Sequence, residues 1–236
     1  MCIRDRMTYS ATPRHHLTVW YPSVGVYAAR QGSWVLGAKF GSNGDSHNHN
    51  DVGSVTLYRD GRPLLIDVGV ETYSKKTFSP QRYEIWTMQS GWHNLPQFDP
   101  DGAKYDQQPG AAFAAADVTV TDALDGLAMD LAPAYGSVPG LGRYRRSVHL
   151  TDTGLTLRDE TDYPGTVALT LMSVEKPAVD GDTVAFGALA AAAVTGADKI
   201  VTEAVPIVDP RLRQAWPDTL YRTRIYFTQQ LSLVIG

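Results

Sequence analysis

The chain has 236 residues, of which 43% are hydrophobic and 19% are charged, and its formal net charge is -4 at pH 7. This composition is typical of a folded globular protein, and it excludes the broad basic surface that neutralises many nucleic-acid phosphates. We therefore expect no nucleic-acid partner. No run of about eighteen apolar residues occurs, so we also expect no membrane span.

The first fourteen residues differ from the rest of the chain. The opening segment 1–6 contains the single cysteine, Cys2, precedes a second methionine, Met7, and lacks the apolar region of a signal peptide. We therefore interpret residues 1–14 as an artefactual or disordered lead-in. Residues 15–236 are expected to form one domain, because all-β domains of this length are common. One cysteine allows no internal disulfide.

From residue 26 onward, short apolar or alternating runs bounded by Gly, Pro, Asn and Asp recur, which is typical of β-strands. The runs are 26–29, 33–40, 52–58, 63–68, 112–120, 126–132, 144–150, 154–160, 166–172, 183–186 and 221–229. The pair Asp60-Gly61 between two of them predicts a hairpin over residues 52–68. This spacing favours an all-β antiparallel sandwich or barrel over alternating strands and helices.

Two segments depart from the strand pattern. A helical turn is expected over residues 210–216, with Asp209 as its N-cap and Pro210 at its first helical position. The Ala-rich stretch 188–193 favours a helix by propensity, but its Gly, Val and Thr neighbours favour a strand or loop equally.

Two clusters of cations stand out against the acidic total. They are Lys75, Lys76 and Arg82, and Arg143, Arg145 and Arg146. A local cluster can hold a polyuronate whatever the net charge of the chain, because the field in a groove depends on nearby charges. Clusters of this size are nevertheless typical of solvated surface, and we interpret them so.

The densest group of chemically active residues is Ser-His-Asn-His-Asn-Asp at 46–51, between the Gly-rich stretch 41–45 and the predicted hairpin. The spacing of His47 and His49 indicates a metal or catalytic site, with an ordinary polar loop as the alternative. Two histidines spaced by two would share one face of a regular strand, so a bulge or the preceding loop must separate their roles.

Asp67 and His93 are candidates to complete a metal site with His49. Asp67 ends the second strand of the hairpin that His49 begins, and adjacent strands lie about 5 Å apart. Two imidazoles and one carboxylate form a ligand set that suits zinc and leaves a fourth position for water.

Four motifs together resemble the signature of the heparinase II/III C-terminal domain. They are SHNHNDVGS at 46–54, DGRPLLIDVG at 60–69, Arg82-Tyr83 and His93-Asn94. The likeness is closest over residues 34–95. It implies a large antiparallel β-sandwich of the supersandwich type that follows an (α/α) toroid, with an active site in the cleft between the two.

The resemblance also implies roles for individual residues. It places the metal ligands on His49, Asp67 and His93, and a catalytic histidine on His47. Such enzymes are lyases that cleave uronic-acid-containing polysaccharides by β-elimination, with a toroid that supplies the other catalytic groups and with periplasmic or secreted localisation. We expect the zinc to be structural, because elimination needs no activated water, and we expect the isolated chain to be inactive.

The segment after Asp67 is long enough to reach the expected cleft. Tyr73, Arg82 and Tyr83 are candidates for substrate contact, Tyr as a proton relay and Arg on a carboxylate. The alternative is that Tyr83 packs the sandwich beside Trp86.

Two other functions fit parts of the sequence. A cupin enzyme carries its HxH motif six residues after a glycine, as at Gly41, but it needs a carboxylate shortly after the second histidine, where only Asp51 stands. A non-catalytic carbohydrate-binding or structural sandwich could stack sugars on exposed tryptophans. The candidates are Trp20, Trp34, Trp86 and Trp92. Such a module has no need of His47 beside a metal site, which separates it from a lyase.

Overall fold

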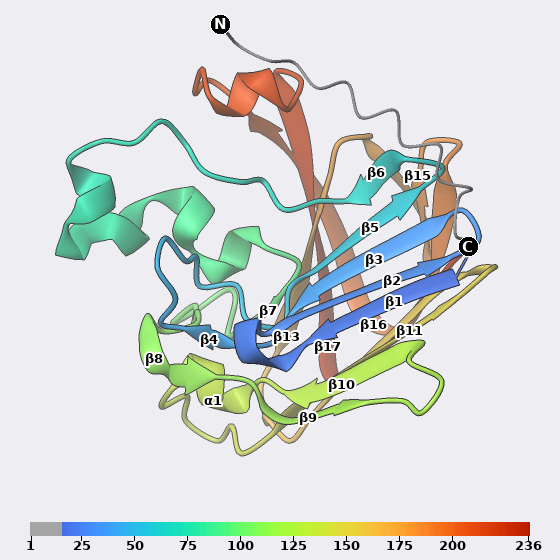
Figure 1. Cartoon of the computed structure of the whole chain (residues 1–236), viewed down its shortest axis with the longest axis horizontal. Coiled ribbons are helices and arrows are strands. Elements are labelled where there is room, and N and C mark those ends of the chain that lie inside the picture. The colour runs from blue at the N-terminus through green and yellow to red at the C-terminus, as the bar shows by residue number, and fades with distance from the viewer. Residues whose placement is uncertain (1–15) are drawn as a thin grey trace, which may run out of the picture.

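The computed structural model describes residues 16–236, so the interpretation of residues 1–14 as a lead-in lies outside the described residues. The described chain consists mainly of antiparallel strands in three sheets, with 3-10 turns and one short α-helix, α1 (Ala132–Tyr135) (Figure 1). The predicted all-β sandwich is therefore confirmed. Within this part of the chain, the helices are all too short to cross a bilayer.

The first sheet contains five antiparallel strands in the order β1-β2-β3-β5-β6. Their bounds are β1 (His16–Tyr21), β2 (Val26–Gln31), β3 (Trp34–Lys39), β5 (Val55–Arg59) and β6 (Arg62–Leu65). The β5–β6 hairpin is confirmed, since Arg59 pairs with Arg62 across Asp60 and Gly61. Both turn residues have positive φ angles, 51° and 73°, which is the geometry of a type I′ turn. The strand β1 was not predicted.

The second sheet is larger and contains the strands β14-β15-β16-β17-β12-β11-β10-β9, with β13 and β7 paired beside β17. Their bounds are β7 (Pro96–Phe98), β9 (Ala116–Val120), β10 (Gly126–Asp130), β11 (Tyr144–Thr151), β12 (Gly154–Thr161), β13 (Val167–Ser173), β14 (Pro177–Asp180), β15 (Thr183–Phe186), β16 (Ala190–Pro206) and β17 (Thr219–Ile235). The ambiguous Ala-rich stretch thus begins a strand. A third, two-stranded sheet joins β4 (Ser42–Asn43) to β8 (Gly110–Ala114).

The hydrophobic core lies between the two large sheets. Alternate residues of each strand point inward, as the period of two requires. Among them are Tyr27, Leu36 and Leu57 from the first sheet and Val148, Leu157, Phe227 and Leu233 from the second. A smaller apolar cluster lies beneath the connection from β16 to β17 and includes Ile66, Met172, Ile207, Leu212 and Leu220. The described strands form stacked sheets and close into no barrel, which removes the main support for a cupin.

The segment between β6 and β7 projects from the sandwich as a lobe of 3-10 turns (Figure 1). The turns are η2 (Lys76–Phe78), η3 (Pro80–Glu84), η4 (Trp86–Met88) and η5 (Ser90–Trp92). The helical turn expected over 210–216 is present only as η6 (Leu212–Gln214). The N-cap of η6 is Arg211, so the prediction of Asp209 at that position is wrong. Asp209 still supports the turn from two residues earlier, because its Oδ1 accepts hydrogen bonds from the backbone N–H groups of Arg211 and Leu212.

Candidate metal centre

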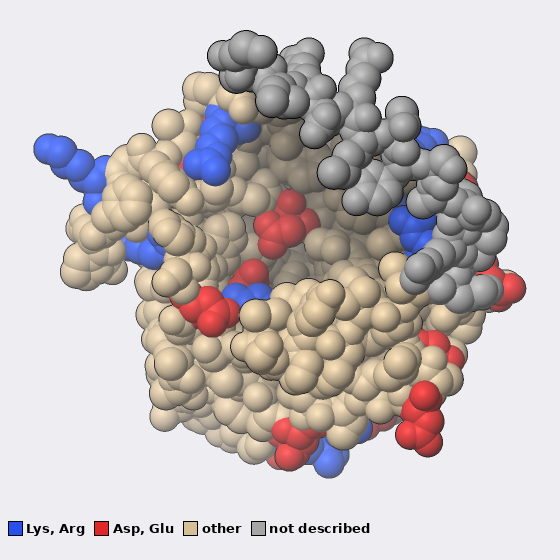
Figure 2. All heavy atoms as spheres, viewed as in Figure 1, with Lys and Arg blue, Asp and Glu red and all other residues tan. Residues whose placement is uncertain are grey.

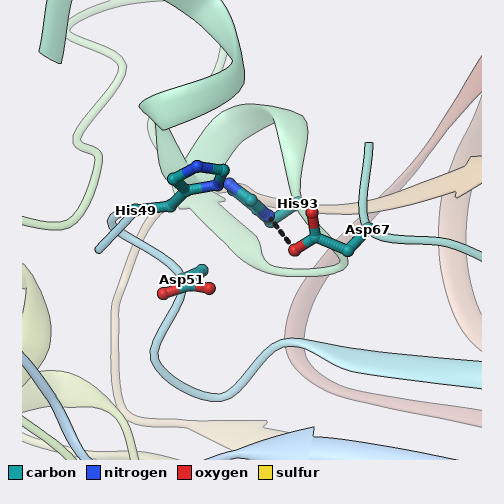
Figure 3. A group of neighbouring side chains, drawn as sticks. All are labelled: His49, Asp51, Asp67 and His93. Carbon is teal, nitrogen blue, oxygen red and sulfur yellow. Dashed lines mark ion pairs between the residues drawn. The ribbon is translucent and has the colours of Figure 1, made fainter. Parts of the chain in front are cut away.

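Three separate segments bring four possible metal ligands together. His49 and Asp51 lie in the loop between β4 and β5, Asp67 follows β6, and His93 follows η5. One ligand atom from each lies within 4.8 Å of the others (Figure 3). The structure thus joins the predicted residues His49, Asp67 and His93, and it adds Asp51.

Sequence reasoning missed Asp51 as a ligand, although it stands two residues after His49 in the same motif. Its Oδ1 atom lies 2.5 Å from Lys39 Nζ, so this carboxylate already has a cationic partner. Asp67 pairs instead with His93: its Oδ1 accepts the Gly69 N–H at 2.7 Å, and its Oδ2 lies 3.2 Å from His93 Nδ1. Each carboxylate thus has a partner, so a metal would have to displace Lys39 from Asp51 and a proton of His93 from Asp67.

The ring of His93 is oriented for metal binding. Its Nε2 donates to the Thr87 carbonyl at 3.1 Å, because a carbonyl oxygen can only accept. The buried Nδ1 has no hydrogen-bond partner among the described residues and lies 3.2 Å from Asp67 Oδ2. In a neutral imidazole with its proton on Nε2, Nδ1 carries the lone pair that a metal needs. An orphaned nitrogen that faces a carboxylate and a second imidazole fits a zinc ion.

The electrostatics of the cluster also suit a cation. Burial lowers the pKa of His49, and the nearby His93 lowers it further. Burial acts in the same direction on His93, but the charge of Asp67 outweighs it and raises the pKa of His93 above its ordinary value. Burial acts to raise the pKa of Asp67, yet the charge of His93 holds this pKa well below the usual range. The negative field that draws a proton to His93 would equally attract a metal cation.

Asn94 fixes the backbone next to His93. It is fully buried, and its Nδ2 donates to the carbonyls of Val55 at 2.6 Å and Ile66 at 3.0 Å, while its Oδ1 accepts the Met172 N–H at 2.7 Å. One side chain thus joins β5, the end of β6 and β13. The position of His93 is therefore set by both sheets.

Arg146 supports the same region from within the core. Its Nε and Nη2 atoms hold the carboxylate of Asp159 at 2.8 and 2.7 Å. Its Nη1 donates to the carbonyls of Gly53 at 2.9 Å and Asn94 at 2.7 Å. The interpretation of Arg146 as solvated surface is wrong, since its side chain is 0% exposed. Its four hydrogen bonds satisfy the buried guanidinium, as a buried charge requires.

His47 lies in the same loop as His49 but outside the four-residue group. Its φ of 60° is left-handed, so the loop and not a regular strand separates the directions of the two histidines, as the sequence required. The exposed ring of His47 lies parallel to Tyr73, with centroids 6.3 Å apart. His47, His49 and both carboxylates line one hollow, and Figure 2 shows acidic side chains inside a hollow on this face.

Arg82 and Tyr83 hold this loop in place. Arg82 donates from Nη2 to the Asn48 carbonyl at 2.7 Å and from Nη1 to the Thr77 carbonyl at 3.0 Å. The hydroxyl of Tyr83 donates to Asn48 Oδ1 at 3.0 Å. Both residues therefore donate hydrogen bonds to Asn48, which lies between the two histidines. Their contact with substrate stays a prediction, as does that of Tyr73, which is the most exposed of the three.

The structure is similar to about a third of each of several solved proteins. Heparinase III matches with a TM-score of 0.62 and 21% identity over 90% of this chain and 35% of its own. A mutant heparan sulfate lyase from Pedobacter heparinus gives 0.64 and 14%, over 93% and 36%. A mutant chondroitin AC lyase from Streptomyces coelicolor gives 0.52 and 11%, over 96% and 33%. At these identities the likeness establishes the fold.

The chain spans about a third of the length of these solved proteins. No curated protein matches it significantly. The family described as "Heparinase II/III-like, C-terminal" matches residues 13–233, nearly the whole sequence. With its β-sandwich and its signature motifs, the chain belongs to the heparinase II/III-like C-terminal domain family.

Proposed function

We propose that this chain is the C-terminal module of a polysaccharide lyase that cleaves uronic-acid-containing polysaccharides by β-elimination. One observation carries the proposal: an exposed histidine, His47, shares a hollow with a cluster of metal-binding side chains. The solved proteins of similar fold, named as heparinase III, heparan sulfate lyase and chondroitin AC lyase, support a glycan substrate with acidic sugars.

The chemistry explains why this module needs a partner domain. Elimination requires that the uronate carboxylate be neutralised, that the C5 proton be removed and that the departing glycosidic oxygen be protonated. We assign the proton exchange with a substrate in the hollow to His47, because its ring is exposed there. An (α/α) toroid of the same protein would supply the remaining groups, so the isolated module is expected to be inactive. We also propose that the full-length protein is periplasmic or secreted.

We assign a structural role to the zinc site. His49, Asp67 and His93 would hold the ion, with Asp51 beside them as a possible fourth ligand. When bound, the zinc would tie the His49 loop to the segments after β6 and η5, and would fix the direction of the neighbouring His47.

A non-catalytic sugar-binding sandwich has less support. Trp34 is buried, so the expectation of an exposed indole there is wrong. Trp20 stacks on Phe40 with centroids 4.3 Å apart, and Trp86 packs edge-on against Trp92 at 5.0 Å. The four candidate platforms are thus engaged in packing rather than presented as free flat surfaces.

The first test is the zinc content of the purified chain after zinc loading. About one zinc per chain is expected in the wild type, and little in His49→Ala or Asp67→Ala. His149→Ala is the control, because its ring is 47% exposed and pairs with Asp125 away from the site. A wild-type chain without zinc would contradict the ligand assignment.

The second measurement uses the full-length protein and the absorbance of the unsaturated product. His47→Ala is expected to abolish product formation while it keeps the zinc. Full activity in that variant would exclude His47 as a catalytic residue.

A further inference from the structure

An exposed arginine extends the surface around His47. Arg211 lies in the connection between β16 and β17, and its guanidinium carbon sits 4.8 Å from the centroid of the Tyr73 ring. Tyr73 is parallel to His47, and Phe78 meets Tyr73 edge-on at 5.5 Å. Three segments that are distant in sequence thus form one continuous surface that begins at the hollow.

The connection that carries Arg211 is fixed to the segment that carries Tyr73. Asp209 Oδ2 accepts the Thr72 N–H at 3.1 Å, while its Oδ1 accepts the Arg211 N–H. Further along, Trp216 Nε1 donates to the Val68 carbonyl at 2.8 Å. These contacts set the place of Arg211 relative to the strand end that carries Asp67, without any bound ligand.

The charge of Arg211 is available to an anion. Its side chain is exposed, and no ion pair joins it to an acidic group within residues 16–236. Neighbouring cations differ: Lys76 pairs with Glu84 at 2.9 Å, and Arg213 lies 4.0 Å from Asp218. A guanidinium stacked on an aromatic ring keeps its planar fork of N–H donors free, and this fork matches a carboxylate.

Phe78 supplies an apolar surface on the same tyrosine. Its side chain is 70% exposed, it ends η2, and its ring contacts Tyr73, as does Arg211. An exposed aromatic ring can stack on the apolar face of a sugar, while an arginine on the same tyrosine can bind a carboxylate.

We propose that Arg211, with Tyr73 and Phe78, forms a subsite for a hexuronate unit adjacent to the one that His47 contacts, and that Arg211 binds its carboxylate. The inference rests on the proposed lyase function and names a determinant of its substrate class. The separation of the His47 ring from the Arg211 guanidinium is no greater than the sum of their two distances to Tyr73. Neighbouring sugar units of one glycan can therefore face both residues.

The test compares the binding of two ligands to full-length, zinc-loaded protein by calorimetry, with His47→Ala in every protein, including the one that is wild type at position 211, so that the ligands are bound and not cleaved. The ligands are an oligosaccharide of alternating hexuronate and hexosamine units and the same oligosaccharide with its carboxyl groups reduced to alcohols. The wild type is expected to prefer the acidic form by about tenfold or more, the size of a charge-assisted hydrogen bond. Arg211→Met should lose most of this preference, and Arg211→Lys should keep part of it, because lysine retains the charge but not the fork.

Two further variants make the result specific. Arg213→Met removes a cation from the same turn and should keep the wild-type preference. Phe78→Ala should weaken both ligands similarly and leave their ratio unchanged. Both side chains are exposed, so these variants should fold.

Three outcomes would overturn the proposal. In the first, Arg211→Met keeps the wild-type preference, which removes the subsite and leaves the proposed function intact. In the second, Arg213→Met loses as much preference as Arg211→Met, which reduces the effect to general surface charge. In the third, zinc-loaded wild type binds neither oligosaccharide, which counts against the proposed function itself.

Discussion

The hydrogen bond from His93 Nε2 to Thr87 decides which nitrogen faces the candidate metal site. The proximity of the three predicted ligands could be anticipated from sequence because a hairpin and a family motif place them. Thr87 and Asp51 could not, because their roles depend on where a backbone carbonyl and a loop carboxylate lie in space. Spacing along the chain carries no information on such contacts.

Lys39 allows a prediction at the scale of one residue. Its ammonium group holds Asp51 and repels any cation bound beside it. Lys39→Met should therefore increase zinc affinity several-fold, because it removes the repulsion and releases a fourth ligand. Competition with a coloured chelator measures this change. Lys199→Met, a change of the same type on the distant strand β16, should have no effect, and a weaker zinc site in Lys39→Met would show that Lys39 mainly positions Asp51.

Among the structural elements, the β5–β6 hairpin could be predicted from the sequence, and the lobe after β6 could not. The hairpin was predicted because Asp60 and Gly61 determine a tight turn by themselves. The lobe 69–95 was not, because each 3-10 turn spans only three to five residues and has no hydrophobic period. Its shape depends on contacts with the His49 loop, such as the hydrogen bond from Arg82 to the Asn48 carbonyl.

The hairpin turn gives a stability prediction. A Cβ atom at Gly61 would meet no atom within 4 Å, so Gly61→Ala should cost only the backbone strain of its φ of 73°, about 1 kcal/mol. Thermal unfolding should shift down by a few degrees, with zinc content unchanged. Asp60→Asn is the matched control and should be neutral, because asparagine favours this turn. A loss of zinc in Gly61→Ala would mean that the turn controls the site at its far end.

At the scale of the whole molecule, the pair of Arg146 and Asp159 links the core to the site. In β11 the residues Tyr144, Val148 and Leu150 point inward, and the period of two puts Arg146 on the same face. This alternation was present in the sequence and could have corrected the interpretation of Arg146 as surface. What alternation could not show is that its donors reach two loops beside the site, at Gly53 and Asn94.

Replacing Arg146 and Asp159 tests how much this pair contributes to stability. Arg146→Met should destabilise the fold by about 4 kcal/mol, because it leaves Asp159 as an unpaired buried charge. Adding Asp159→Leu should recover part of this loss but not all, since two backbone carbonyls still lack a donor. Chemical denaturation measures both. Arg145→Met, the outward neighbour, should change stability by less than about 0.5 kcal/mol, and a similar effect there would contradict the special role of Arg146.

The place of β17 in the large sheet has a consequence for biosynthesis. This strand follows all other described strands in the sequence, yet it lies inside the sheet, paired with β16 along one edge and with β13 and then β12 along the other. While the ribosome still holds its residues, three strands emerge with unpaired edges, which are templates for aggregation. The nascent domain therefore cannot close its sheet until β17 is released, and until then those edges are open to pairing with other chains.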